Sequence, residues 1–170
     1  MLLLEGAHLL EELLLQGYQP REVIITERWC ERQSALYNRL DKGVVRRLVT
    51  DEVLGAALTT VTPDGVASLC GLDSLPAAPG DPTFLLVLDR IQDPGNLGTL
   101  LRTALAADVE AVWLGSGVDP LGTKVLRASA GALLQLPHQR FGPDAATALD
   151  RLEPILKQRA AAGMQVVASL

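Results

Sequence analysis

A continuous apolar run, LLVL at 85–88, constrains the fold of this chain more than any other segment. With Phe84 before it and Asp89 after it, the run predicts a strand over 84–89 that is buried on both faces, as strands of parallel sheets are. AVWLG at 111–115 has the same character. Because two parallel strands need a long crossover that is usually helical, the segment between them is expected to contain a helix.

Helical and apolar segments continue to alternate toward the C-terminus. Helices are predicted at about 122–134 and 144–162, with a short strand or connector at 136–141 and a strand-like QVVASL at 165–170. The order β-α-β-α-β-α-β predicts a parallel sheet wound with helices. Such a sheet needs both faces covered, and no helix follows the last strand, so the C-terminus is expected to be cut short.

The first half of the chain predicts a smaller α/β/α domain. Apolar residues at helical spacing predict an amphipathic helix that ends near Gly17, namely Leu3, Ala7, Leu10 and Leu14. The other elements expected here are strands at 22–26, 44–49 and 66–72, a polar helix at 28–38 and a short helix with Asp51 as its N-cap. The proline-rich segment at 73–82 marks a boundary, which gives domains 1–74 and 83–170 joined by a linker at 75–82.

Composition excludes several classes of protein. Of the 170 residues, 48% are hydrophobic and 21% are charged, which is typical of a folded globular chain. No apolar stretch is long enough to span a membrane, and MLLL at the start lacks the basic lead of a signal peptide. Cys30 and Cys70 are the two cysteines, and their spacing gives neither a disulfide framework nor a zinc site. We therefore expect a cytoplasmic protein without a structural metal.

The net charge of −5 disfavours a nucleic-acid partner until its distribution is considered. Residues 1–50 carry seven basic and seven acidic side chains and residues 82–170 carry eight of each, so the deficit lies in the five acidic residues of 51–81. A candidate RNA-facing patch in the first domain consists of Arg28, Arg32, Arg39, Lys42, Arg46 and Arg47. The alternative is a solvated face, because acidic residues are interleaved with these basic ones.

The residues with chemical potential are concentrated at 88–104, where the first buried strand meets the following helix. Ligands of open parallel sheets bind beyond the carboxyl ends of the strands. Asn96 is expected to cap the helix, and Arg102 lies one turn after Gly98, whose missing side chain leaves the guanidinium room to fold back. Asn96 and Arg102 are therefore expected to converge on one crevice, where the helix N-terminus favours an anion such as phosphate.

Each of these two residues also has a plain structural interpretation. Asn96 alone is most simply a helix cap, and Arg102 alone is an arginine that is solvated or ion-paired with Asp89 or Asp93. Competing motifs are absent from the sequence, which has no phosphate-binding G-x-x-x-x-G-K-[ST] loop and no G-x-S-x-G elbow. G-x-G occurs at 115–117 without a third glycine, too little for a dinucleotide site.

DPGNLGTLLRTA (93–104) resembles motif 1 of the SpoU/TrmH family of RNA 2′-O-ribose methyltransferases, in which Asn, Gly and Arg stand in the order of Asn96, Gly98 and Arg102. Three other segments resemble that family's next segment and its ribosomal-protein-like RNA-binding domain, namely 118–137, 2–14 and 59–69. Four matches in the same order cover nearly the whole chain, which favours membership of the family.

The resemblance implies a small RNA-binding domain over 1–74 and a partial methyltransferase domain of the SPOUT, trefoil-knot type over 83–170. It also implies S-adenosylmethionine (SAM) as cofactor, a homodimer, and methylation of a ribose 2′-OH in structured RNA, with ribosomal RNA favoured over transfer RNA. The catalytic role falls on Arg102, with Asn96 shaping the site, and Arg127 joins the residues expected to contact RNA. Since arginine stays protonated, its fitting role is to hold phosphate and stabilise the developing alkoxide.

The family's motifs 2 and 3 form the knot and most of the SAM pocket, and they would follow the strand predicted at 165–170. The SAM-binding loops are therefore expected beyond Leu170, and no cofactor-binding residue is assigned within the chain. The alternative function is a non-catalytic RNA-binding relative or fragment that lacks the SAM site. A third hypothesis is an unrelated nucleotide-binding α/β domain.

Overall fold

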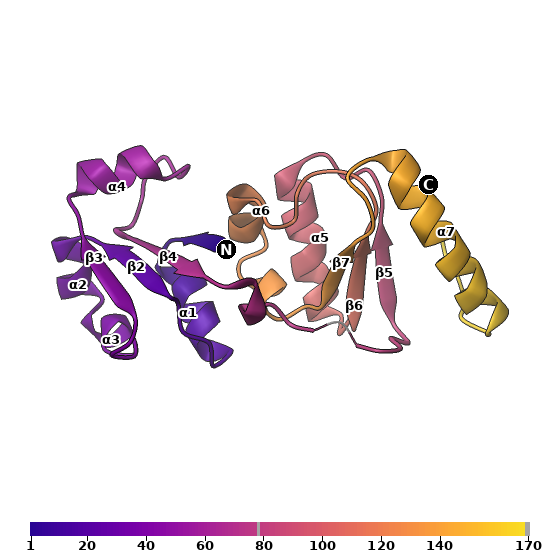
Figure 1. The fold of residues 1–170 in the computed structure, drawn as a ribbon, viewed down its shortest axis with the longest axis horizontal. Coiled ribbons are helices and arrows are strands. Elements are labelled where there is room, and N and C mark those ends of the chain that lie inside the picture. Colours follow the sequence, from indigo (N-terminus) through magenta and orange to yellow (C-terminus); the bar gives the residue numbers. More distant parts are fainter. Residues whose placement is uncertain (78, 169–170) are drawn as a thin grey trace.

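Two α/β units lie next to each other along the long axis of the molecule in the computed structural model, which describes residues 1–77 and 79–168 (Figure 1). The first unit contains a four-stranded mixed sheet, and the second contains a three-stranded parallel sheet. The predicted α/β class with a parallel sheet is confirmed.

The first sheet has the strand order β1-β4-β2-β3. Its strands are β1 (Leu2–Glu5), β2 (Glu22–Ile25), β3 (Val45–Leu48) and β4 (Val66–Cys70). The helices of this unit are α1 (Ala7–Leu15), α2 (Glu27–Arg32), α3 (Ser34–Tyr37) and α4 (Asp51–Ala57). A short 3-10 helix at Leu72–Ser74 follows β4. Buried Leu10, Val23 and Trp29 form the centre of this unit's own core.

Three predictions for the first unit need correction. The helix predicted over 3–14 begins at Ala7, because Leu2–Glu5 pair with β4 as a strand and Gly6, with a φ of 101°, turns the chain between the two. Leucine suits both structures, so its spacing did not separate them. The polar helix predicted at 28–38 is interrupted at Gln33, and Thr50 rather than Asp51 caps α4 by accepting a hydrogen bond from the Val53 N–H.

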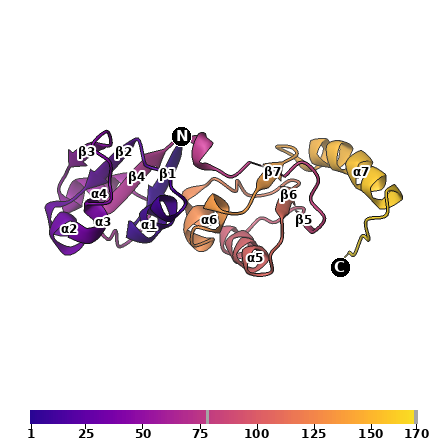
Figure 2. The same cartoon turned by 90° about the horizontal axis from the view of Figure 1, so that it is seen from below.

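The second sheet has the order β5-β6-β7, and all its pairs are parallel. Its strands are β5 (Leu85–Leu88), β6 (Ala111–Leu114) and β7 (His138–Arg140), and its helices are α5 (Pro94–Ala106), α6 (Thr123–Ala128) and α7 (Ala145–Ala161). Figure 2 shows α5 on one side of the strands and α7 on the other. The central strand β6 is fully buried as predicted, whereas β5 is only half-buried because it forms an edge of this sheet.

Two further segments of this unit differ from the predictions. The helix expected at 122–134 ends at Ala128, because Ala130 and Gly131 adopt left-handed backbone angles before a 3-10 turn at Ala132–Leu134. Residues 165–168 form no strand, and positions 169 and 170 of the strand predicted at 165–170 lie outside the described residues. Within the described part of the chain, no helix is long and apolar enough to cross a membrane.

The two units share one hydrophobic core in spite of the proline-rich segment between them. Leu2, Leu4 and Leu9 of the first unit belong to the same buried cluster as Leu101 of α5 and Leu126 of α6. Helix α6 lies between the units, where it packs against α5 on one side and against β1 on the other. A large apolar contact of this kind holds two domains in one orientation, whereas a linker alone leaves them free to move.

Candidate functional site

The carboxyl ends of β5 and β6 are joined by polar contacts. Asp89, directly after β5, accepts hydrogen bonds from the Ser116 N–H at 3.0 Å and from its hydroxyl at 3.1 Å. Burial raises the pKa of the Asp89 carboxyl, but the two bonds from Ser116 and the charge of Arg90 outweigh it, so that pKa lies below its ordinary value. Gly117 must be glycine, because a Cβ there would lie 2.3 Å from the Ile91 carbonyl oxygen.

The sequence analysis did not assign Ser116 or Gly117 to this edge. G-x-G at 115–117 is too short for a dinucleotide motif, and its glycines instead let the loop after β6 approach the loop after β5. A Gly-Ser-Gly tripeptide directly after a buried strand was the available signal, because such glycines mark a close backbone approach.

Helix α5 begins at this edge of the sheet. Its N-cap is Asp93, which accepts a hydrogen bond from the Asn96 N–H at 2.8 Å, and Pro94 occupies the first helical position. The prediction that Asn96 caps the helix is therefore wrong, because Asp followed by Pro is the better start signal. Asn96 instead lies in the first turn with an exposed side chain. Since its amide is not needed as a cap, it is available to a ligand.

Gly98 is buried where α5 meets α6. A Cβ on Gly98 would lie 2.4 Å from the Cβ of Ala128 and 2.8 Å from the Ser129 nitrogen. The missing side chain therefore allows two helices to touch, rather than leaving room for the Arg102 guanidinium as predicted. The predicted reason for a glycine at position 98 is therefore wrong, but Arg102 does lie one helical turn after it.

Arg102 is exposed on the second turn of α5 and makes no ion pair with any other residue in the described ranges 1–77 and 79–168. The two carboxylates considered as its partners are engaged elsewhere, Asp89 with Ser116 and Arg90, and Asp93 with the helix cap. The ion-paired alternative is thus not what the structure contains, while an exposed, solvated arginine is consistent with it. A guanidinium that keeps its donors free can bind a phosphate or an oxyanion.

Asn96 and Arg102 are six residues apart on one helix. That spacing places them about 9 Å apart along the axis and about 120° apart around it, on either side of the buried stripe of Leu97 and Leu101. No hydrogen bond joins them within the described residues. Their convergence on one substrate therefore remains a prediction, and it requires a ligand about as long as a nucleotide.

The basic patch of the first unit is divided by its contacts. Arg46 is half-buried and donates to the carbonyl oxygens of Val44 and Leu40, each at 2.9 Å, and its guanidinium lies 5.3 Å from the Tyr37 ring centre. These contacts show that Arg46 holds the turn before β3 in place. The contacts of the Arg46 side chain are therefore structural, and they leave its guanidinium less available for RNA than an exposed arginine would be.

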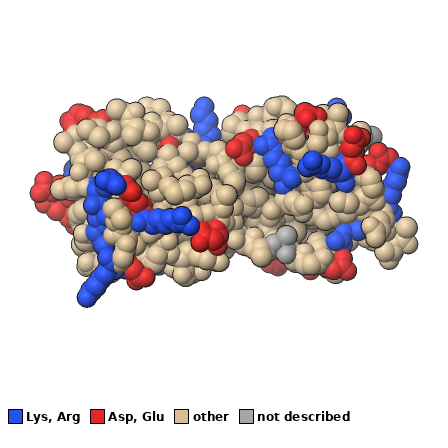
Figure 3. Space-filling model, viewed as in Figure 1, with Lys and Arg blue, Asp and Glu red and all other residues tan. Residues whose placement is uncertain are grey.

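The other members of the patch differ in whether their side chains are ion-paired. Arg47 is ion-paired with Glu22, and Arg39 lies 3.7 Å from Glu11. The members that are exposed and make no ion pair with another described residue are Arg28, Arg32 and Lys42. Figure 3 shows the basic side chains over the region of β3 with acidic ones beside them, so this surface is mixed rather than purely positive.

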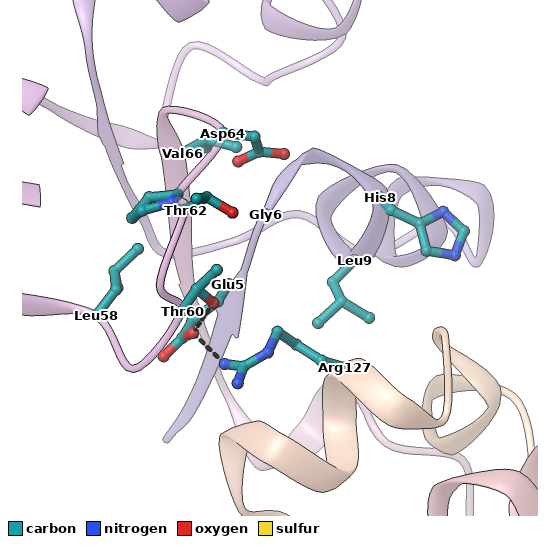
Figure 4. A pocket seen from close by; sticks show the side chains of 11 residues that line it. Glu5, Gly6, His8, Leu9, Leu58, Thr60, Thr62, Asp64, Val66 and Arg127 are labelled. Atoms are coloured by element: carbon teal, nitrogen blue, oxygen red, sulfur yellow. Dashed lines mark hydrogen bonds and ion pairs between the residues drawn. The ribbon is translucent and has the colours of Figure 1, made fainter. Parts of the chain in front are cut away.

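Arg127 lies on α6 at the junction of the two units. Its guanidinium is ion-paired with Glu5 of β1 (Figure 4). It also donates to the Thr59 hydroxyl at 2.8 Å. Burial raises the pKa of Glu5, but hydrogen bonds from Thr60 and Thr59 and the charge of Arg127 outweigh it, so that pKa lies below its ordinary value. Arg127 was assigned to RNA binding, and the structure gives it a contact between the units.

The described residues contain no metal-ligating cluster, and polar groups at the carboxyl edge bond to one another. No group of three or more His, Cys, Asp or Glu side chains among them could hold a metal ion. At the carboxyl edge, the polar groups of Asp89 and Ser116 bond to each other, and the Gly117 carbonyl accepts a hydrogen bond from Arg140 at 2.8 Å. These contacts hold together the two loops of the carboxyl edge.

These observations together define a class: an α/β protein of two units, with an exposed arginine on the helix that begins at the carboxyl edge of a parallel sheet. Comparison with known proteins identifies the family. The model of the SpoU rRNA Methylase family matches residues 83–168, and this chain belongs to that family. The resemblance inferred from the sequence is confirmed.

Relatives and solved structures support the same assignment. A protein of Synechocystis sp. named as an uncharacterized tRNA/rRNA methyltransferase is 44% identical over 172 residues, which cover 99% of this chain and 60% of that protein. The 23S rRNA (guanosine(2553)-2′-O)-methyltransferase RlmP of Bacillus subtilis is 32% identical over 139 residues, covering 81% of this chain and 53% of that protein. This chain thus spans little more than half the length of these relatives.

Two solved structures have a similar fold. A crystal structure of an RNA 2′-O ribose methyltransferase has a TM-score of 0.70 and 26% identity, covering 93% of this chain and 59% of that one. An rRNA methyltransferase from Sinorhizobium meliloti, solved with S-adenosylmethionine bound, has a TM-score of 0.64 and 26% identity, covering 94% and 58%.

Proposed function

We propose that this chain is part of a SAM-dependent methyltransferase that modifies a ribose 2′-OH in RNA, ribosomal RNA in particular. The observation that carries the proposal is the exposed Arg102, which makes no ion pair with the described residues and lies within the segment matched by the family model. The motif role of Arg102 comes from the resemblance of 93–104 to motif 1. The names of the relatives support an rRNA substrate, and the SAM-bound neighbour supports the cofactor.

In this function, Arg102 binds the phosphate next to the reacting ribose and stabilises the negative charge that develops on the 2′ oxygen. A guanidinium does this well because it donates several hydrogen bonds in a fixed plane and keeps its charge throughout the reaction. Asn96, exposed in the first turn of the same helix, would orient the ribose or its neighbour. SAM supplies the methyl group when bound, and the residues described here supply the binding and orientation of the RNA.

The first domain would bind the rest of the RNA substrate. Its exposed cations without ion pairs to other described residues, Arg28, Arg32 and Lys42, are the first candidates for phosphate contacts, and Arg39 and Arg47 could exchange their carboxylate partners for phosphate. A homodimer and a cytoplasmic location complete the proposal. Both rest on the resemblance to the family.

Replacing the arginine tests the catalytic role. In the full-length protein, Arg102→Ala should lower the rate of methyl transfer from radiolabelled SAM to unmodified ribosomal RNA by about 10²–10³-fold, the effect of losing one oxyanion-stabilising donor. Arg102→Lys should recover only part of this, because lysine lacks the planar fork. Lys157→Ala, on exposed α7, is the matched control for loss of a surface charge.

An Arg102→Ala protein as active as the wild type would contradict the catalytic assignment. The alternative is a non-catalytic RNA-binding relative. If the full-length wild type neither binds SAM nor methylates RNA, yet binds RNA in a salt-dependent way, the RNA-binding relative is the correct function.

A further inference from the structure

The contact between Glu5 and Arg127 is built differently from the other ion pairs of the molecule. The Glu5 side chain is 1% exposed and the Arg127 side chain 28%, whereas pairs such as Arg21–Asp73 are mostly exposed. Removing a carboxylate from water is costly, so such a group is found where its bonds are fully made. Glu5 is buried at the junction of the two domains, at the end of the strand whose Leu2 and Leu4 belong to the shared core.

Every oxygen of the Glu5 carboxylate is satisfied. Thr59 donates its N–H and its hydroxyl to Oε1, each at 3.0 Å, and Thr60 donates its hydroxyl to Oε2 at 2.5 Å. Arg127 completes the set from the other domain (Figure 4). The Thr59 hydroxyl also lies 3.1 Å from that of Thr123 on α6. The network thus joins β1 and the loop before β4 to two successive turns of α6.

The same segment of α6 is fixed to the helix that carries Arg102. Ala128, the neighbour of Arg127, touches α5 at Gly98 so closely that a Cβ would not fit between them. Arg102 lies one helical turn after Gly98. A continuous line of contacts therefore runs from Glu5 in the first domain, through α6, to the proposed catalytic arginine.

Apolar packing alone already holds the domains together, so the ion pair must add something else. Burial of apolar surface is non-directional, and it tolerates small rotations of one domain on the other. A charged pair with fixed hydrogen-bond directions stabilises a single orientation. The distance between the RNA-binding surface of the first domain and Arg102 is then set by this network.

We propose that Glu5 and Arg127 are positioning residues that fix the first domain relative to Arg102, and thereby select the 2′-OH that lies at a set distance from the RNA-binding surface. This inference rests on the proposed function, which it deepens by assigning a specificity role to two residues outside the catalytic helix. The fixed arrangement of the two domains would then set the distance between the RNA element bound by the first domain and the methylated nucleotide.

The test compares single and double variants of the full-length protein. Glu5→Gln and Arg127→Met alone should each lower the melting temperature, because each leaves one partner without its opposite charge. The double variant Glu5→Gln/Arg127→Met has no unpaired charge, and its melting temperature should return toward the wild-type value. Its site selectivity should not return, because the directional contact is still missing. Arg21→Met/Asp73→Asn, an exposed pair within the first domain, is the matched control.

Selectivity is measured by mapping 2′-O-methyl groups on unmodified ribosomal RNA transcribed in vitro, with primer extension at low nucleotide concentration. The ratio of methylation at the principal site to methylation elsewhere should fall at least about tenfold in the double variant, since small misplacements at a reacting centre cost a large factor in rate. Arg127→Lys should give an intermediate ratio. The control double variant should keep the wild-type ratio.

The outcomes separate the two proposals. An active wild type and a double variant of wild-type stability and unchanged site ratio would overturn the positioning role while leaving the methyltransferase intact. A wild type that methylates no RNA would overturn the proposed function, and the selectivity role would fall with it. Residual dipolar couplings give a readout without activity: the relative orientation of the domains should change or average in the double variant, and an unchanged orientation would also overturn the positioning role.

Discussion

The two faces of the parallel sheet are covered in very different ways. Toward α5 and α6, residues such as Val112 and Leu114 of β6 join a large buried cluster that extends into the first domain. Toward α7, the cluster consists of Trp113, Phe141 and Leu152 with half-buried neighbours. An apolar cavity of about 260 Å³ remains between β5 and α7, and Leu149 beside it is 56% exposed.

The difference shows that the face of the sheet toward α5 and α6 is packed more closely than the face toward α7. The closely packed face carries the helix of Asn96 and Arg102 and the helix of Arg127, to which the proposals assign fixed positions. Helix α7 is attached by fewer groups, among them Arg159, which bonds to Asp81 at 2.8 Å and lies 5.1 Å from the Trp113 ring centre. The face of the sheet toward α5 and α6 is therefore the more rigid one, and it is the face that carries the proposed catalytic residues and the proposed positioning contact.

The largest expected difference between the two faces comes from truncating one leucine on each. Leu101→Ala removes a side chain that is 0% exposed between α5, α6 and the first domain, and it should lower the free energy of unfolding by about 3–5 kcal/mol through lost burial and the cavity left behind. Leu149→Ala, on exposed α7, should change it by less than about 0.5 kcal/mol. Urea unfolding followed by circular dichroism measures both, and equal losses would refute the asymmetry.

Most of the fold followed from patterns that are local in the sequence. The apolar runs gave β5 and β6, and the long helix expected at 144–162 is α7, with Asp144 as its cap. Where the sequence analysis failed, two local structures were compatible with the same residues. Leu3 fits a helix stripe and a strand equally well, and pairing of β1 with β4, more than 60 positions away, decided between them.

The second prediction concerns the contact between α5 and α6. Gly98→Ala should destabilise the protein by about 2 kcal/mol or more, because the new Cβ meets backbone atoms of Ala128 that cannot swing aside. Gly55→Ala is the matched control, since Gly55 lies in helix α4 with no atom within 4 Å of the position of its Cβ. There alanine should stabilise by about 0.5–1 kcal/mol. A Gly98→Ala protein as stable as the wild type would mean that the helices can separate freely.

The site was predictable to the extent that its residues follow one another in the chain. Asn96 and Arg102 stand in one motif on one helix, so the sequence identified both as candidates. The reasons for Gly98 and Arg127 could not be found in the same way, because each depends on a contact with a distant element. Glu5 illustrates the limit, since nothing near it in sequence shows that its carboxylate is buried against a residue 122 positions away.

The smallest expected effect is a pH dependence of stability at β7, the edge strand of the parallel sheet. His138 of β7 stands opposite Val112, on the face of the sheet that α5 and α6 cover. Burial lowers the pKa of its imidazole, and a hydrogen bond to the Leu136 carbonyl oxygen at 3.1 Å only partly offsets this. The folded protein thus keeps His138 neutral at pH values where the unfolded chain already binds a proton.

The sign of the pH dependence follows from this difference. Because the unfolded state binds more protons below its pKa of about 6.5, stability contributed by neutral His138 is fully present above that pH and is lost as the pH falls toward the lower pKa of the folded state. His138→Gln should therefore make the free energy of unfolding less dependent on pH between 7 and 5, as measured by urea titrations at each pH. His8→Gln, which removes the exposed histidine of α1, is the matched control. A pH dependence that His138→Gln leaves unchanged would show that the imidazole is as well solvated on this face as in the unfolded chain, and the contrast between the two faces would not extend to β7.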